Sequence, residues 1–219
     1  MYPIIKKEKL ADKIYLMDVK AERVAKSAKP GQFVIVKIDE EGERIPLTIC
    51  DYDEKAGTVT IVFQTVGAST ERMAYLEEGD TFQDFVGPLG CPSDLIEEDI
   101  EELKKKKIVF IAGGVGTAPM LYLGEQLAKN GHKPTFLLGA RSDKDLLQLE
   151  EFVKYGEVYT TTEDGSHGEK GYVTQHSILN KVRFEQIYTC GPKPMMVAVA
   201  KYAKSNQIEC EVSLENTMA

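Results

Sequence analysis

Residues 108–119 read I-V-F-I-A-G-G-V-G-T-A-P, and this stretch decides the fold of half of the chain. Its apolar start is typical of a buried parallel strand, and a glycine-rich turn follows directly, before a helical pattern at 118–128. Glycines let a backbone approach a diphosphate, and the first turn of a helix presents unpaired N–H groups to it. The stretch therefore predicts a dinucleotide site whose members are Gly113, Gly114, Gly116, Thr117 and Pro119.

The spacing departs from the common G-x-G-x-x-G pattern, because Pro119 stands where the third glycine would be. A tight strand–helix turn without a ligand is therefore the alternative interpretation. The pattern around the turn favours the site, since strands and helices alternate along the second half of the chain. We expect strands at 108–112, 135–138, 158–161, 186–189 and 208–212, and helices at 118–128, 146–153 and 195–204. This alternation predicts an α/β domain with a parallel sheet at 99–219.

Two more loops follow strands of this predicted sheet. One contains Asp164 and Gly165, and the other contains Cys190, Gly191, Pro192 and Met195. In an open parallel sheet, ligands bind beyond the carboxyl ends of the strands, so we expect all three loops to face one crevice. For Cys190, a buried apolar role at the strand end is as well supported as a role in chemistry.

The first part of the chain predicts a different architecture. Short β-rich runs at 14–19, 32–38, 44–50, 58–64 and 82–86 are separated by glycines, and a helical pattern lies at 69–77. This spacing predicts an antiparallel β-barrel at 1–98 with one helix. An acidic and then basic stretch, which ends in four lysines at 104–107, marks the boundary and predicts a solvated lead-in to the next strand.

Two runs in the predicted barrel suit a phosphate-bearing ligand. In R-I-P-L-T-I at 44–49, the alternation of a strand places Arg44, Pro46 and Thr48 on one face. In Q-T-V-G-A-S-T at 64–70, Gly67 and the hydroxyls of Ser69 and Thr70 lie at the start of a helix. Ordinary turn chemistry is the alternative for both runs.

Composition excludes several classes of function. The chain has 219 residues and a net charge of −8 with scattered basic residues, which does not favour a nucleic-acid partner. It contains no long apolar run and no signal-peptide pattern at its start, so we expect no membrane partner and a cytoplasmic location. The four cysteines form no C-x-x-C pair, so we expect no metal site within the chain.

The order of the motifs resembles the ferredoxin-NADP reductase superfamily over essentially the whole chain. The motifs are R-I-P-L-T-I, V-G-A-S-T, G-P-L-G at 87–90, G-G-V-G-T-A-P, D-G-S and C-G-P-K-P-M-M. Within the superfamily, the chain resembles two bacterial subunits. One is the electron-transfer subunit of dihydroorotate dehydrogenase, and the other is the small subunit of NADH-dependent ferredoxin:NADP oxidoreductase, also called sulfide dehydrogenase.

The resemblance implies FAD between the two domains. Pro46, Leu47 and Thr48 would line the isoalloxazine ring, with the Thr48 hydroxyl near the reactive nitrogen. Cys190 would lie near the nicotinamide, so that Thr48 and Cys190 are the candidate catalytic residues. The other implied FAD contacts are Val62, Phe63 and Gln64 at the ribityl chain and adenine, and Ser69 and Thr70 at the pyrophosphate. One departure concerns Arg44. The superfamily's arginine aligns with Ile45, so the resemblance does not carry its phosphate-binding role over to Arg44.

The resemblance also implies a function. NADH or NADPH would reduce the flavin, and electrons would pass singly to a catalytic partner. That partner would be dihydroorotate dehydrogenase, in pyrimidine biosynthesis, or a glutamate synthase-like flavoprotein. Arg141 and Ser142 suit the 2′-phosphate of NADPH, whereas Asp143 suits a free ribose hydroxyl, and we expect NADH.

In the resembled subunits, a segment like S-L-E-N-T-M-A at 213–219 leads into C-G-x-G-x-C-x-x-C, which binds a [2Fe–2S] cluster. We therefore expect the present chain to be truncated, with the cluster only in a longer native chain. The alternatives are a free-standing ferredoxin- or flavodoxin-NAD(P) reductase and an assembly module without a cofactor.

Overall fold

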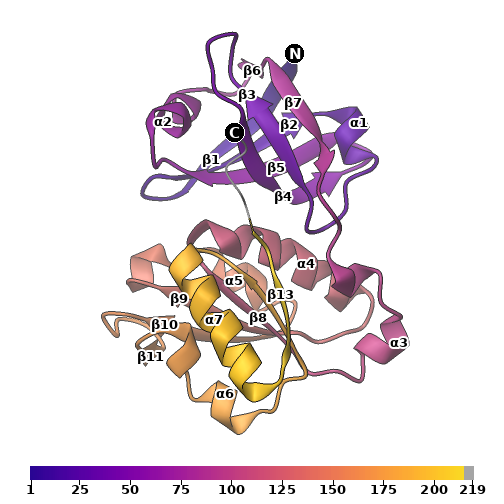
Figure 1. Ribbon diagram of the computed structural model, residues 1–219. Helices are drawn as coiled ribbons and strands as arrows, with labels where there is room; N and C mark the ends of the chain where they lie inside the picture. Colours follow the sequence, from indigo (N-terminus) through magenta and orange to yellow (C-terminus); the bar gives the residue numbers. More distant parts are fainter. Residues whose placement is uncertain (215–219) are drawn as a thin grey trace. The chain divides into compact units, whose positions relative to one another are not determined.

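The computed structural model describes residues 1–214, and the last five residues of the C-terminal motif lie outside the described part. The chain forms two compact units, Met1–Ser93 and Asp94–Leu214 (Figure 1). No helix of the described residues is long and apolar enough to cross a lipid bilayer.

The first unit is a seven-stranded antiparallel sheet that curls into a nearly closed barrel, in the strand order β6-β1-β2-β5-β4-β3-β7 (Figure 1). The predicted barrel is therefore confirmed. Its strands are β1 (Tyr2–Ala11), β2 (Ile14–Lys20), β3 (Phe33–Lys37), β4 (Ile45–Asp53), β5 (Thr58–Gln64), β6 (Thr81–Phe82) and β7 (Asp84–Leu89), and its helices are α1 (Glu22–Ala25) and α2 (Ala68–Ala74).

The barrel core follows from strand alternation. On β4 and β5, Leu47, Ile49, Ile61 and Phe63 point inward and pack together, and Met73 of α2 is fully buried against them. On β5, and on β4 up to the register shift after Ile49, residues of the opposite parity face away from the core. Arg44 lies one residue before β4 and is therefore not part of the strand, which differs from the expected strand at 44–50.

The sequence did not predict β1, because two register shifts in its pairing with β2 interrupt the alternation of the strand. The shifts lie between Ile4 and Lys6 and between Lys9 and Ala11. A pattern with period two cannot be read through such bulges.

The second unit is a six-stranded sheet, and all of its neighbouring strands run parallel, in the order β11-β10-β9-β8-β12-β13. The predicted α/β domain is therefore confirmed. Its strands are β8 (Ile108–Gly113), β9 (Thr135–Ala140), β10 (Glu157–Thr162), β11 (Glu169–Lys170), β12 (Gln186–Cys190) and β13 (Glu209–Val212). Its helices are α3 (Ile100–Leu103), α4 (Thr117–Lys129), α5 (Leu149–Phe152), α6 (Ile178–Lys181) and α7 (Lys193–Asn206), with short 3₁₀ turns η1 (Asp94–Ile96), η2 (Gly114–Gly116), η3 (Asp143–Asp145) and η4 (Val173–Gln175).

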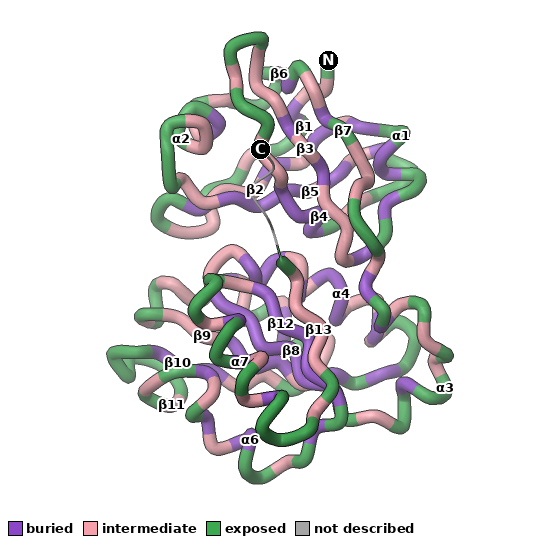
Figure 2. The backbone as a smooth tube through the Cα atoms, in the orientation of Figure 1, coloured by how far each residue is buried: buried purple, intermediate pink, exposed green. Residues whose placement is uncertain are grey.

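Both faces of this sheet are covered. On one face, Phe110 and Leu138 pack against Leu123 of α4, and on the other, Ile111 packs with Val199 of α7. All six residues of β8 are buried as a result. Figure 2 shows the central strands of this unit mostly in the colour of buried residues. This is why residues 108–112 read as a continuous apolar run instead of an alternating one.

The expected helix at 146–153 is shorter than the pattern predicted. Gln148 has a φ of +54°, in the left-handed region, so no helix passes through it. The helix α5 begins only after this residue, at Leu149.

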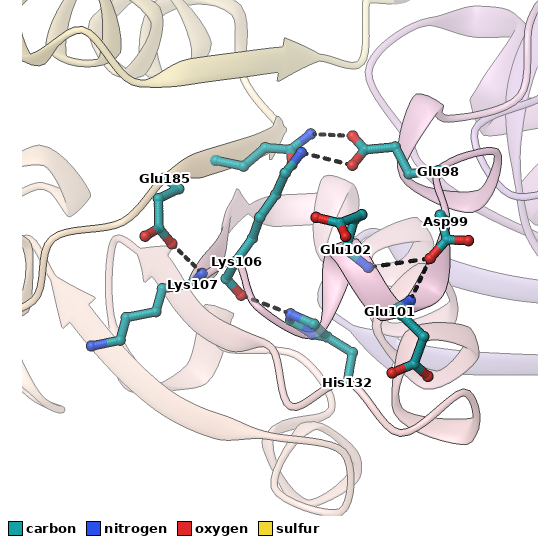
Figure 3. A network of polar contacts seen from close by, with 9 residues as sticks. Glu98, Asp99, Glu101, Glu102, Lys106, Lys107, His132 and Glu185 are labelled. Carbon is teal, nitrogen blue, oxygen red and sulfur yellow. Dashed lines mark hydrogen bonds and ion pairs between the residues drawn. The ribbon is translucent and has the colours of Figure 1, made fainter.

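The lysine run is only partly solvated (Figure 3). The ammonium of Lys106 lies 2.7 Å from Glu98 and 3.3 Å from the Gln186 side-chain oxygen, and the Lys107 amide donates to Glu185. His132 Nε2 donates to the Lys106 carbonyl over 3.1 Å, because a carbonyl oxygen can only accept. These bonds fix the start of β8, at the edge of the sheet opposite to its carboxyl ends.

Candidate functional site

The sheet of the second unit has one topological switch point. From β8 the chain moves to β9 and then β10 on one side, and it returns to β12 and β13 on the other side. The loops that leave β8 and β12 therefore lie at this switch point, and open α/β sheets bind ligands beyond the carboxyl ends of the strands at such a point. These two loops are the predicted glycine loop and the loop that begins at Cys190.

The two loops are in backbone contact. A Cβ atom on Gly116 would lie 2.6 Å from the carbonyl carbon of Cys190 and 2.6 Å from the Gly191 nitrogen. A Cβ atom on Gly191 would lie 2.8 Å from the Gly113 carbonyl oxygen. Since real Cβ atoms do not approach so closely, glycines are required for the loops to meet.

Gly114 differs from its neighbours, because its φ of +56° needs glycine while nothing lies within 4 Å of a Cβ placed there. The backbone is thus open beside η2 and the start of α4. Thr117 donates its hydroxyl to the Gly114 carbonyl over 2.8 Å and keeps this turn closed. The first turn of α4 carries no acidic residue, so its N–H groups and dipole favour an anion there.

Pro119 is the third residue of α4. A proline is tolerated in a first helical turn, where an N–H group has no partner within the helix. The strand–turn–helix geometry therefore accommodates Pro119 at the place where the common motif has its third glycine.

The start of α7 completes this part of the candidate site. Pro192 precedes the helix, and Met195 extends over the glycines, with its sulfur 3.0 Å from the position of a Cβ on Gly113. Cys190 is buried and belongs to the apolar layer that also contains α4 residues. The predicted first and third loops are therefore brought together.

The Asp164 loop joins a different neighbour. Asp164 accepts hydrogen bonds from the Ser166 amide at 2.9 Å and the Ser166 hydroxyl at 2.7 Å, and these bonds lower the pKa of Asp164. The Ser166 oxygen accepts in turn from the Asp143 amide at 2.8 Å, while Gly165 adopts a φ of +79° in the turn. Asp164 and Gly165 thus tie the loop after β10 to the loop after β9.

The loop after β9 contains an ion pair. Arg141 lies 3.6 Å from Asp145, and both residues are substantially exposed. Ser142 donates its hydroxyl to the same carboxylate over 3.1 Å. The sequence did not reveal the part that Ser166 plays between the two loops, although the D-x-S spacing of an Asx turn was a readable signal.

In the barrel, the candidate residues divide between two faces. Leu47 and Phe63 lie in the core, whereas Pro46, Thr48, Val62 and Gln64 have the opposite parity. Thr48 and Val62 are nevertheless buried. Arg44 is two-thirds exposed and lies 3.6 Å from Asp84 of β7.

The turn before α2 is closed by Thr70, and Gly67 is the residue that caps the helix. The Thr70 oxygen accepts from the Val66 amide at 2.9 Å and from the Gly67 amide at 3.2 Å. The cap therefore lies two residues before Ser69, and the threonine hydroxyl reaches back to it from the first turn of the helix. Ser69 instead donates to Glu43, and a Cβ on Gly67 would meet nothing within 4 Å.

Comparisons with known proteins agree with this two-unit architecture. Residues 110–201 match the family of oxidoreductase NAD-binding domains. An uncharacterized protein from the adh 3′ region of Clostridium beijerinckii is 48% identical over 226 residues, which cover 100% of this chain and 75% of the relative.

A homologue of the dihydroorotate dehydrogenase B (NAD(+)) electron transfer subunit from Thermotoga maritima is 34% identical over 217 residues, which cover 98% of this chain and 74% of the relative. A solved structure of the NADH-dependent reduced ferredoxin-NADP oxidoreductase, determined in work on flavin-based electron bifurcation, superposes with a TM-score of 0.90 at 33% identity. This superposition covers 100% of this chain and 78% of that one. The chain is therefore an oxidoreductase of the electron-transfer kind. It belongs to the ferredoxin-NADP reductase superfamily and, within it, to the family of dihydroorotate dehydrogenase B electron transfer subunits and their homologues.

Proposed function

We propose that this chain binds FAD in its barrel unit, accepts reducing equivalents from NADH in its α/β unit and passes electrons to a catalytic partner subunit. The observation that carries the proposal is the backbone contact between the Gly116 and Cys190 loops at the switch point, beside the open backbone of Gly114. Such a place suits the diphosphate of a dinucleotide, because N–H groups and a helix dipole meet it without side chains in the way. In this proposal, Gly113, Gly114, Gly116 and Thr117 bind the diphosphate, and Cys190 to Pro192 lie near the nicotinamide.

We propose NADH in preference to NADPH. The one arginine of the loop after β9, Arg141, already faces the Asp145 carboxylate, and the loop also contains Asp143. A 2′-phosphate would have to displace Asp145 and approach a second carboxylate, whereas a ribose hydroxyl can donate to one. The names of several relatives, which specify NAD(+), support the same choice.

The residues of the barrel fit FAD. Thr48 offers a hydroxyl on the face that points away from the core, with Pro46, Val62 and Gln64 on the same side of their strands. The Gly67 backbone is open, and the Ser69 hydroxyl already holds a carboxylate, which is an oxyanion like a phosphate. When bound, FAD supplies the chemistry that converts a two-electron donor into one-electron transfers. The protein residues orient the rings, exclude water and donate hydrogen bonds.

The partner is proposed from the relatives. Their names describe electron transfer subunits of dihydroorotate dehydrogenase B, so a flavoprotein of that kind, or a glutamate synthase-like one, is the candidate acceptor. A [2Fe–2S] cluster is proposed only for a longer native chain. Among residues 1–214, no group of three or more His, Cys, Asp or Glu side chains lies close enough to hold a metal ion.

Reconstitution tests the proposal directly. The purified chain, incubated with FAD and freed of excess, should retain a flavin absorption spectrum that NADH bleaches under anaerobic conditions. It should reduce ferricyanide with NADH, and a chain extended by the C-G-x-G-x-C-x-x-C segment should also reduce the partner. Folded protein that retains no flavin would exclude the proposal and favour an assembly module. Rapid partner reduction without the extension would favour a reductase that needs no cluster.

A further inference from the structure

Two side chains of α2 hold carboxylates from one neighbouring loop. Arg72 pairs with Asp39, and Ser69 donates to Glu43, so both partners lie in the loop between β3 and β4. Ser69 and Arg72 are three residues apart and therefore share one face of the helix. A hydroxyl and a guanidinium that already bind oxyanions thus lie side by side.

The direction of the Arg72 side chain matters. Side chains in a helix lean toward its N-terminus, so Arg72 leans toward the turn that contains Ser69 and the open backbone of Gly67. Guanidinium groups bind phosphate oxygens through two parallel N–H donors, and a hydroxyl adds a third. The pair is suited to a diphosphate as well as to two carboxylates.

The other arginine of this region is less well placed. Arg44 precedes β4 and faces Asp84 on β7, and the side chain of the next residue, Ile45, packs against the barrel core. The arginine at the start of β4 is therefore directed toward β7 and not toward the turn before α2.

We propose that Arg72, together with Ser69, binds the diphosphate of FAD, and that Asp39 and Glu43 occupy this pair when no dinucleotide is bound. This inference rests on the proposed FAD site and adds the residue that compensates the diphosphate charge. The exchange is feasible because the Arg72 and Asp39 side chains are 48% and 47% exposed, and exposed ion pairs contribute little to stability. Asp39 is then a competitor of the ligand.

The competing interpretation is that the Arg72–Asp39 pair only fastens the loop to the helix. The two interpretations predict opposite effects for Asp39. If the pair is a fastener, removal of either partner weakens FAD binding to a similar extent. If Arg72 binds the diphosphate, removal of Asp39 releases it for the ligand and strengthens binding.

The experiment is a titration of the flavin-free full chain with FAD, followed by flavin fluorescence at low and high salt. Arg72→Met should weaken FAD binding by about tenfold or more and reduce the salt dependence of the dissociation constant, because one phosphate contact is lost. Asp39→Asn should tighten binding, and Arg72→Lys should fall between Arg72→Met and the native chain. Arg23→Met, an exposed arginine of α1, is the matched control and should bind FAD normally.

Thermal unfolding of each flavin-free variant separates binding from folding. Equal weakening of FAD binding by Arg72→Met and Asp39→Asn, or an unchanged affinity in Arg72→Met, overturns this inference while the FAD proposal stands. If the native chain itself binds no FAD, the proposed function fails and the inference fails with it.

Discussion

Gly116 faces the carbonyl group of Cys190 so closely that a single added methyl group would lie 2.6 Å from it. Because the obstacle is backbone, Gly116→Ala must push the two loops apart, at a cost of about 1–3 kcal/mol of stability, as for other overpacked positions. We expect a lower melting temperature and a markedly higher KM for NADH.

Gly114→Ala is the informative comparison. Its methyl group meets nothing within 4 Å, but the left-handed backbone costs an L-residue about 1–2 kcal/mol. We expect a similar loss of stability with the loops still in contact. Because this methyl group would enter the open space proposed for the diphosphate, we expect a higher KM for NADH here as well, and an unchanged KM would remove Gly114 from the nucleotide site. Calorimetric melting and steady-state kinetics provide both measurements.

Thr48→Val tests the proposed flavin contact. The substitution keeps the shape of a buried residue and removes its hydroxyl, which leaves a ring nitrogen unmatched at a cost of about 1–3 kcal/mol. Stopped-flow reduction of the bound flavin by NADH should slow by about fivefold or more. Thr60→Val on β5 is the control, because that hydroxyl donates to Asp18 over 2.6 Å and is given no part in flavin binding. An unchanged rate in Thr48→Val removes Thr48 from the site.

Asp145→Asn tests the choice of nucleotide. The change releases Arg141 from an exposed pair worth about 0.2–1 kcal/mol, so the ratio of kcat/KM for NADPH to that for NADH should rise by up to about fivefold. Glu125→Gln removes the partner of Lys129 on α4 and should leave the ratio unchanged. A ratio that does not move in Asp145→Asn indicates that Arg141 does not meet the 2′ position.

His176 predicts how stability depends on pH. Burial lowers the pKa of His176 below its ordinary value of 6.5, although the Glu169 carboxylate at 3.6 Å opposes this effect. The native state thus holds fewer protons than the unfolded chain, and stability is lost as the pH falls below about 6.5. In His176→Asn, whose side-chain oxygen can still accept from the Ile178 amide as Nδ1 does, the melting temperature should fall less between pH 7 and pH 5. If the melting temperature of His176→Asn falls as much between pH 7 and pH 5 as that of the native chain, another group causes the pH dependence.

The two architectures were predictable from sequence because each has a strong local signal. Residues 108–112 are continuously apolar since helices cover both faces of β8, and the alternation of Leu47, Ile49, Ile61 and Phe63 records the barrel core. The strand β1 was missed for the opposite reason, because its bulges interrupt the alternation.

For the candidate site, the sequence predicted which loops take part but not which residues of these loops are in contact. Each glycine loop follows a strand and can be read locally, but the contact of Gly116 with Cys190 joins residues 74 positions apart and follows only from strand order. The partners of Ser69 and Arg72 lie 26 and 33 positions from them in the sequence, so no local pattern predicts these contacts either. The helical pattern at 69–77 likewise does not show that the Thr70 hydroxyl reaches back to the Val66 amide.

The strand order also divides the α/β unit by how readily its parts open. The loops of Gly113 and Cys190 follow β8 and β12, each of which has a strand on both sides, whereas the Asp164 loop connects β10 to the two-residue edge strand β11. Amide hydrogens of Ile111 and Tyr188 should therefore exchange with solvent only through global unfolding, and those of Glu169 and Lys170 through local fraying. If this edge faces the nucleotide as proposed, one half of it lies in a segment that opens only on global unfolding and the other half lies beside a strand that frays.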